Sequence, residues 1–145
     1  MNIQIKRVHE NAVIPTYAHG SNDDACFDLI AVSREIVDNK DHGYISYGTG
    51  LQMAIPEGFV GLIFPRSSVS NTGLFLANCV GVVDPSYRGE ISARFKWIKD
   101  SKMYEIGDRV CQMMIIPREV VEFEEFTGDW EETARNDKGY GSSGN

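Results

Sequence analysis

The sequence predicts an all-β barrel or sandwich for this chain of 145 residues. Short runs rich in apolar residues recur along it, and glycine, proline, asparagine and aspartate separate them at turn-like intervals. No long segment sustains the periodicity of a helix. The length is that of one domain with a substantial core.

The expected strands follow from alternation and from short apolar runs. Alternating residues face opposite sides of a strand, so segments of period two predict half-buried strands, and an apolar run bounded by turns predicts a buried one. Strands are expected over residues 3–8, 50–56, 59–64, 90–98, 110–116 and 120–123. One helical turn is expected over residues 67–72, with a serine as its N-cap and Gly73 as its C-terminal stop.

Composition excludes several classes of function. The chain carries 14 basic and 21 acidic residues, a net charge of −7, which does not favour non-specific binding to nucleic acid. Residues 1–7 lack the apolar run of a signal peptide, and no stretch has the length of a membrane span. Three widely spaced cysteines predict reduced thiols, and no metal-ligand spacing involves them. A cytoplasmic protein without membrane or stable nucleic-acid contacts is therefore expected.

Residues 134–145 form a tail with no apolar face. Three glycines and two serines fall within its last seven positions, with Tyr140 between them and Arg135 just upstream. Two interpretations are open. Such a segment is typical of a frayed terminus. Its N–H groups, hydroxyls and guanidinium could also close over phosphate oxygens while the ring stacks on a base.

Three further segments carry candidate binding groups. Arg66, Ser67 and Ser68 follow an apolar strand and open the helical turn, where free N–H groups favour an anion; an ordinary capped turn is the alternative. Asp84 ends an expected hairpin strand, where its carboxylate could activate a water molecule or simply form the turn. Gln112 is a single amide in an apolar run and needs a backbone or ligand partner.

Five segments resemble, in order, the five motifs of the homotrimeric dUTPase (deoxyuridine triphosphate nucleotidohydrolase) family. They are residues 25–31, 65–68, 81–89, 107–113 and 135–144, and each is moderately specific by itself. Their order and co-occurrence carry the resemblance. The departures are Cys26 in place of a small glycine, Asn136 and Lys138 in place of tail glycines, and Tyr140 where phenylalanine is commonest.

The resemblance implies a jelly-roll β-barrel over residues 1–133, a flexible tail over residues 134–145 and a homotrimer whose active sites are shared between subunits. It also implies hydrolysis of dUTP to dUMP and pyrophosphate, which keeps uracil out of DNA and supplies dUMP for dTMP synthesis. Asp84 would be the base that activates the attacking water at the α-phosphorus. Mg²⁺ would bridge the phosphates, held by Asp28 through water.

The other site residues implied by the resemblance fall into two groups. Those for the base and sugar are Asn78 and the backbone of Gly81, Val82 and Val83 at the uracil edge, Tyr87 as a barrier to a 2′-hydroxyl, and Tyr140 as a stacking ring. Those for the phosphate chain are Arg66, Ser67, Ser68 and Gln112 from the barrel, and Arg135, Gly141, Ser142 and Ser143 from a neighbouring tail.

Two alternatives use the same fold. The related dCTP deaminases carry a catalytic glutamate in the strand after the hairpin, at the position that Arg94 occupies here. A regulatory or partner-binding protein is the non-enzymatic alternative, and the full set of catalytic-type residues argues against a pure loss of catalysis.

Overall fold

The computed structural model describes residues 1–38, 43–98 and 100–139, and the all-β prediction is confirmed. Among the described residues, no helix is long and apolar enough to cross a membrane. The elements are β1 (Gln4–Arg7), β2 (Phe27–Ile30), β3 (Ser33–Val37), β4 (Tyr44–Gly48), β5 (Leu51–Ala54), β6 (Phe59–Phe64), the 3₁₀ helix η1 (Ser67–Asn71), β7 (Leu74–Leu76), β8 (Gly81–Val83), β9 (Ser92–Trp97) and β10 (Arg109–Pro117).

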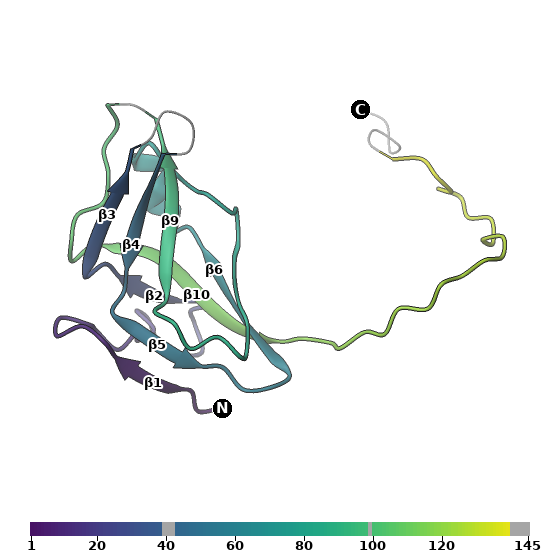
Figure 1. Ribbon diagram of the computed structural model, residues 1–145, viewed down its shortest axis with the longest axis horizontal. Coiled ribbons are helices and arrows are strands. Elements are labelled where there is room, and N and C mark those ends of the chain that lie inside the picture. Colours follow the sequence, from purple (N-terminus) through teal and green to yellow (C-terminus); the bar gives the residue numbers. More distant parts are fainter. Residues whose placement is uncertain (39–42, 99, 140–145) are drawn as a thin grey trace.

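The strands form three antiparallel sheets. The two larger sheets have the strand orders β2-β10-β6-β8 and β3-β4-β9-β7, while β1 pairs with β5 in a small third sheet. Figure 1 shows β3, β4 and β9 side by side, crossing β2, β10 and β6. Two facing sheets of this kind form the jelly-roll-like architecture that the family resemblance implies.

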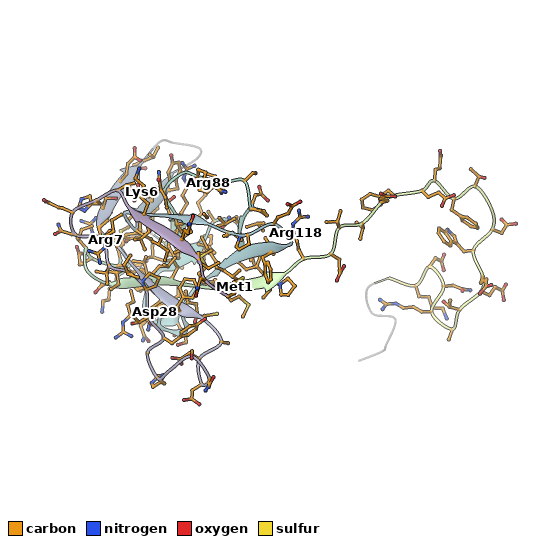
Figure 2. All side chains as sticks on the ribbon, turned by 90° about the horizontal axis from the view of Figure 1, so that it is seen from below. Met1, Lys6, Arg7, Asp28, Arg88 and Arg118 are labelled. Carbon is orange, nitrogen blue, oxygen red and sulfur yellow. The ribbon has the colours of Figure 1, made fainter. Side chains whose placement is uncertain are left out.

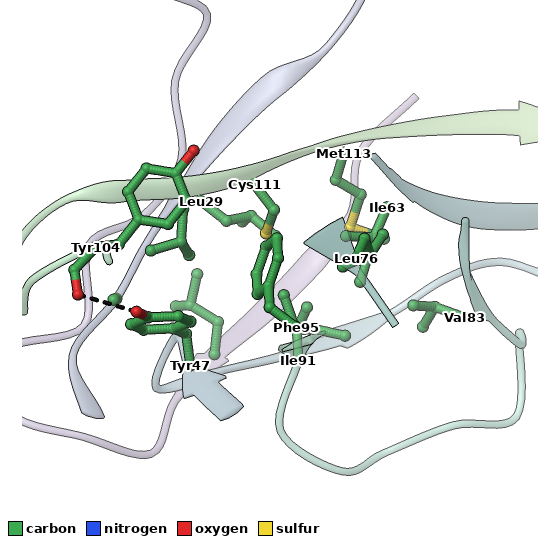
Figure 3. Packing of buried hydrophobic residues seen from close by; sticks show 14 of the residues in the cluster. Leu29, Tyr47, Ile63, Leu76, Val83, Ile91, Phe95, Tyr104, Cys111 and Met113 are labelled. Carbon is green, nitrogen blue, oxygen red and sulfur yellow. Dashed lines mark hydrogen bonds between the residues drawn. The ribbon is translucent and has the colours of Figure 1, made fainter. Parts of the chain in front are cut away.

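The core lies between the two larger sheets. Tyr47 of β4 and Phe95 of β9 meet edge to face, with ring centroids 5.8 Å apart, and both are fully buried. Leu29 and Met113 belong to the same cluster and come from the opposite sheet (Figure 3). The Tyr47 hydroxyl donates a hydrogen bond of 2.9 Å to the carbonyl of Tyr104, so this buried polar group keeps a partner.

The register of β10 determines where several candidate groups lie. β10 runs between β2 and β6, so Gln112 is paired with Asp28 on one side and with Phe64 on the other. Arg66 follows two residues after the end of β6. Strand pairing therefore brings Gln112 beside Asp28, and the turn after β6 places Arg66 in the same region.

The predicted caps of the helical turn are wrong. The helix is a 3₁₀ helix whose N-cap is Arg66, without a side-chain cap bond, and whose C-cap is the extended residue Thr72 (φ −123°). No serine caps its start, and Gly73 does not end it in a left-handed conformation. The hydroxyl of Thr72 donates a hydrogen bond of 2.7 Å to the carbonyl of Val69, which satisfies the helix end locally.

The strand predicted over residues 120–123 is also wrong. Val120 and Phe123 are 74% and 96% exposed. The chain leaves the barrel at Arg118, whose N–H donates a hydrogen bond of 2.9 Å to the carbonyl of Gly58, and then extends away from it (Figures 1 and 2). A strand needs a neighbour for its N–H and C=O groups, and the described part of this single chain places none beside the segment.

Candidate active site

Strand β8 and the loop after it line a pocket of about 180 Å³. Its walls include the five predicted base and sugar residues that the structure describes, together with the predicted catalytic carboxylate. These are Asn78, Gly81, Val82, Val83, Tyr87 and Asp84, and Ile63, Glu90, Ile91 and Ser92 complete the walls. We refer to this cavity as the hairpin pocket. The structure thus brings together residues that the family resemblance assigns to one nucleoside.

The loop after β8 is stabilised by its own hydrogen bonds. The N–H of Tyr87 donates to the carbonyl of Asp84 at 3.1 Å, which closes a turn. Nη1 of Arg88 donates to the carbonyls of Pro85 (2.6 Å) and Tyr87 (2.7 Å). The Tyr87 hydroxyl donates to the carbonyl of Glu90 at 3.0 Å. The Tyr87 side chain is therefore fixed both at its backbone and at the tip of its ring.

Asp84 is suited to activating a water molecule. It is exposed, and its carboxylate has no hydrogen bond or ion pair with another described residue. Its lone pairs are thus available to a water in the pocket.

Two cysteine thiols have raised pKa values. Burial raises the pKa of the Cys111 thiol to about 12, and burial, with the charge of Asp28, also raises the pKa of Cys26. Both thiols stay protonated at neutral pH, so neither competes as the nucleophile.

Asp28 is the centre of a cluster of ion pairs with two arginines. Nε of Arg66 lies 2.6 Å from Oδ1 of Asp28, and Nη2 of Arg66 lies 3.3 Å from Oδ2. Nη1 of Arg109 lies 3.1 Å from the same Oδ2. The side chains of Asp28 and Arg66 are only 19% and 26% exposed. The carboxylate that the family resemblance assigns to magnesium is thus already engaged by two guanidinium groups, with acceptor capacity left for one further donor.

A second pocket of about 290 Å³, which we call the arginine pocket, opens beside this cluster. Nη1 of Arg66 donates a hydrogen bond of 3.1 Å to Oγ of Ser68 at its wall. Three cationic side chains at one pocket suit an anionic ligand. The wall residues are Arg66, Ser68, Asn71, Thr72, Lys102, Tyr104, Asp108 and Arg109.

Sequence reasoning missed two of the three cations of the arginine pocket. Arg109 lies inside the segment 107–113, so a signal existed there, although the segment drew attention for Gln112 instead. Lys102 lies in none of the five segments, and nothing local marks it. Its place beside Arg66 results from the loop before β10.

The remaining candidates lie apart from these two pockets. Nε2 of Gln112 donates a hydrogen bond of 2.9 Å to the carbonyl of Pro65, so its partner here is backbone next to Arg66. Ser67 lines neither pocket. Arg135 is exposed, and its Nε donates to the carbonyl of Lys138 at 3.1 Å. Tyr140, Gly141, Ser142 and Ser143 lie outside the described residues.

The two pockets are separate in the single chain, because no residue lines both of them. No group of three or more histidine, cysteine, aspartate or glutamate side chains that could hold a metal ion occurs in residues 1–38, 43–98 and 100–139. A metal ion at this site would therefore need most of its ligands from a bound molecule and from water.

Comparisons with known proteins agree with the five segments. A family model described as dUTPase matches residues 10–144. The deoxyuridine 5′-triphosphate nucleotidohydrolase of Solibacter usitatus is 36% identical over 146 aligned residues, which cover 99% of this chain and 97% of that protein. The enzyme of the same name from Corynebacterium glutamicum is 37% identical, with 98% and 94% covered.

A solved structure is similar over the same extent. The dUTPase of Staphylococcus bacteriophage 80alpha with dUpNHpp superposes with a TM-score of 0.77 at 26% identity, covering 99% of this chain and 98% of that one. Because the family model and both curated relatives span nearly the whole sequence, the chain belongs to the dUTPase family.

Proposed function

We propose that this protein, a dUTP diphosphatase by family, hydrolyses dUTP to dUMP and pyrophosphate with Asp84 as the base. The observation that carries the proposal is the hairpin pocket, in which Asp84 and Tyr87 share walls with Asn78 and the backbone of β8. In the cell this reaction would keep uracil out of DNA and supply dUMP for dTMP synthesis. Three free cysteines support a reducing compartment, and we include a cytoplasmic location in the proposal.

In this mechanism Asp84 orients a water molecule and takes its proton while the new oxygen–phosphorus bond forms at the α-phosphorus. The bond from that phosphorus to the bridging oxygen breaks, and pyrophosphate leaves. The exposed carboxylate at the wall of the hairpin pocket supports this role, since it has no competing partner among the described residues. A positioned general base typically contributes about 10²–10⁴-fold to the rate.

Strand β8 would select the base. A Cβ added to Gly81 would lie 3.0 Å from Cβ of Ile63 and 3.6 Å from Nδ2 of Asn78, so there is little free space beside Gly81. We infer that the lack of space excludes the 5-methyl group of thymine, while Asn78 and the backbone from Gly81 to Val83 pair with uracil. The ring of Tyr87 would leave no room for a 2′-hydroxyl.

The phosphate chain would be bound by Arg66, Ser67, Ser68 and Gln112, and the site would be shared within a homotrimer. The separation of the hairpin pocket from the arginine pocket supports this, because no residue of the single chain lines both of them. The exposed apolar side chains after β10, among them Phe123 and Trp130, support contacts with another copy. The segment 134–145, with Arg135, Tyr140, Gly141, Ser142 and Ser143, would close over a neighbour's site.

Magnesium fits this site only through water. Direct coordination by Asp28 would compete with Arg66 and Arg109, whereas the remaining acceptor capacity of its carboxylate allows one hydrogen bond from a metal-bound water. When bound, the ion would neutralise part of the triphosphate charge. The task of Asp28 in the chain itself is to hold the guanidinium of Arg66 in a fixed plane beside the arginine pocket.

The proposal is tested by incubating the protein with dUTP, UTP, dTTP and dCTP in turn, with Mg²⁺ present, and identifying the products by chromatography. We expect dUMP and pyrophosphate from dUTP and little reaction with the others. The matched control is Asp84→Asn, which keeps the shape of the side chain but cannot take a proton, and should lower turnover by about 10²–10⁴-fold. Equal turnover in this variant would remove Asp84 from the mechanism.

Deamination of dCTP is not favoured. At the position where the related deaminases carry their glutamate, the guanidinium of Arg94 lies 4.6 Å from the centre of the Tyr44 ring. A cation held on an aromatic face does not act as a general base. Release of ammonia from dCTP in the same assay would show that the protein is a deaminase after all.

A further inference from the structure

We propose that Glu90 is a positioning residue that fixes the Tyr87 ring, and through it the selection of deoxyribose over ribose. The inference rests on the proposed function of the hairpin pocket and adds a residue that the five motif-like segments did not single out. Glu90 lies at the far end of the loop that begins with Asp84, and it lines the same pocket.

The carboxylate of Glu90 ties this loop to a different part of the barrel. Its Oε1 accepts a hydrogen bond of 2.7 Å from the N–H of Gly50, in the turn between β4 and β5. The carbonyl of the same residue accepts the hydroxyl of Tyr87 at 3.0 Å. One residue therefore links the tip of the Tyr87 ring to a turn 40 residues earlier in the chain. Hydrogen bonds to an ionised acceptor are among the stronger ones, so this link suits a rigid support.

Two glycines leave the space that the arrangement requires. A Cβ added to Gly48 would lie 2.6 Å from Oε1 of Glu90 and would also overlap the hydroxyl of Ser33. A Cβ added to Gly89 would overlap the hydroxyl end of Tyr87. The carboxylate and the ring thus each lie beside a glycine, and a side chain at either glycine would displace the group next to it.

The next residue is held by the same turn. The N–H of Ile91 donates to the carbonyl of Leu51 at 2.7 Å, and the hydroxyl of buried Thr49 donates to the carbonyl of Ile91 at 2.7 Å. The Ile91 N–H and the Glu90 carbonyl belong to one peptide group, so the Ile91 anchor holds one end of the group that accepts the Tyr87 hydroxyl, and the Glu90 carboxylate holds the other end. Loss of the carboxylate should loosen the loop on the Tyr87 side of this peptide group without detaching β9, so the effect should fall on the pocket and not on the fold.

The experiment compares Glu90→Ala and Glu90→Gln with the parent. For each protein, kcat/KM is measured with dUTP and UTP, and the affinities for dUMP and UMP are measured by calorimetry. In Glu90→Ala we expect the preference for the deoxy compound to fall about tenfold in both readouts, as expected when a positioning contact is lost. Glutamine retains an acceptor for the Gly50 N–H, so Glu90→Gln should restore the preference to within about threefold of the parent.

Two further variants separate positioning from general stability. Tyr47→Phe removes a buried hydrogen bond to the Tyr104 carbonyl, away from the hairpin pocket, and should lower the melting temperature without changing the preference. Gly48→Ala displaces the Glu90 carboxylate without altering a wall residue and should reduce the preference as Glu90→Ala does. If Glu90→Ala does not fold, Gly48→Ala and Glu90→Gln decide the question.

The outcomes distinguish this inference from the proposed function. A Glu90→Ala variant that melts lower but keeps the parent's preference in both readouts shows a purely structural residue and overturns the inference. A parent that binds dUMP but does not hydrolyse dUTP overturns the proposed function. In that case the ratio of dUMP to UMP affinity, compared between the parent and Glu90→Ala, still tests the role of Glu90. A parent that neither binds dUMP nor hydrolyses dUTP overturns both.

Discussion

Replacing Asp28 with asparagine tests whether its ion-pair cluster stabilises the barrel beside the arginine pocket. Asparagine keeps the shape of the side chain and removes its charge, so Arg66 and Arg109 lose their shared counter-ion. The two guanidinium groups then repel each other, and Arg66 is no longer held in one plane. We expect a lower melting temperature together with a higher KM for dUTP.

The size of the effect follows from burial and geometry. Asp28 and Arg66 are 19% and 26% exposed and make two contacts of 2.6 and 3.3 Å. At an effective dielectric constant of about 20, unit charges about 4 Å apart attract by about 4 kcal/mol. Dehydration of the partly buried charges offsets roughly half of this, and Arg109, which is 53% exposed, adds little. A loss of about 2 kcal/mol in the free energy of unfolding corresponds to about 4–8 °C in melting temperature.

Thermal melting followed by circular dichroism, in parallel with steady-state kinetics, measures both quantities. The matched control is Glu105→Gln, which removes the partner of Arg34 from an ion pair of 3.0 Å whose carboxylate is 72% exposed. Such an exposed pair contributes about 0–1 kcal/mol, so the control should melt close to the parent. If Asp28→Asn has the same melting temperature as the parent, the cluster does not stabilise the barrel and the reasoning is refuted.

Three other predictions concern the proposed mechanism. Tyr87→Ala should admit UTP as a substrate, because the ring is the proposed barrier to the 2′-hydroxyl, and unchanged discrimination between dUTP and UTP would move that barrier elsewhere. Chelation of Mg²⁺ should lower turnover while the melting temperature stays the same, since the described residues hold no metal cluster of their own; a drop in melting temperature would indicate a structural ion instead. Deleting residues 134–145 should leave the melting behaviour unchanged, because that segment has no apolar face to contribute to the core. The deletion should also remove most activity, because the segment is proposed to close over a neighbour's site. Mixing this truncated chain with a full-length Asp84→Asn chain should restore part of the activity. Mixed trimers that stay inactive would contradict a site shared between subunits.

The sequence predicted those features that depend on neighbouring residues. Alternation identified β9, and short apolar runs identified β6 and β10, because each strand buries one face or both within its own run. The hairpin pocket was predictable for the same reason, since most of its walls come from the continuous segment 78–92. The strand over residues 120–123 failed because pairing needs a partner that the described single chain does not supply. Its apolar, β-branched composition is equally suited to contact with another copy.

Contacts between distant segments were beyond sequence reasoning. The bond between Glu90 and Gly50 depends on how β9 lies against the β4–β5 turn, and neither residue stands out locally. Asp28 was assigned to a metal, through water, because the family resemblance implies that role. Its engagement by Arg66 and Arg109 follows from the pairing of β2 with β10 and the position of the turn after β6.

The charge distribution explains why an acidic chain can carry a site for a polyanion. The net charge is −7, yet Arg66, Lys102 and Arg109 gather at the arginine pocket. At physiological ionic strength, exposed charges more than about 8 Å apart are largely screened, so distant acidic residues act weakly on this pocket, whose own walls carry these three cations and one carboxylate, Asp108. Asp28 lowers the positive charge of the cluster, which by itself would weaken phosphate binding. In return it fixes the plane of Arg66, whose Nη1 is directed at Ser68 on the pocket wall. In the proposed function, catalysis depends on the position of the phosphates more than on how tightly they bind, so the orientation that Asp28 imposes would outweigh the charge it removes.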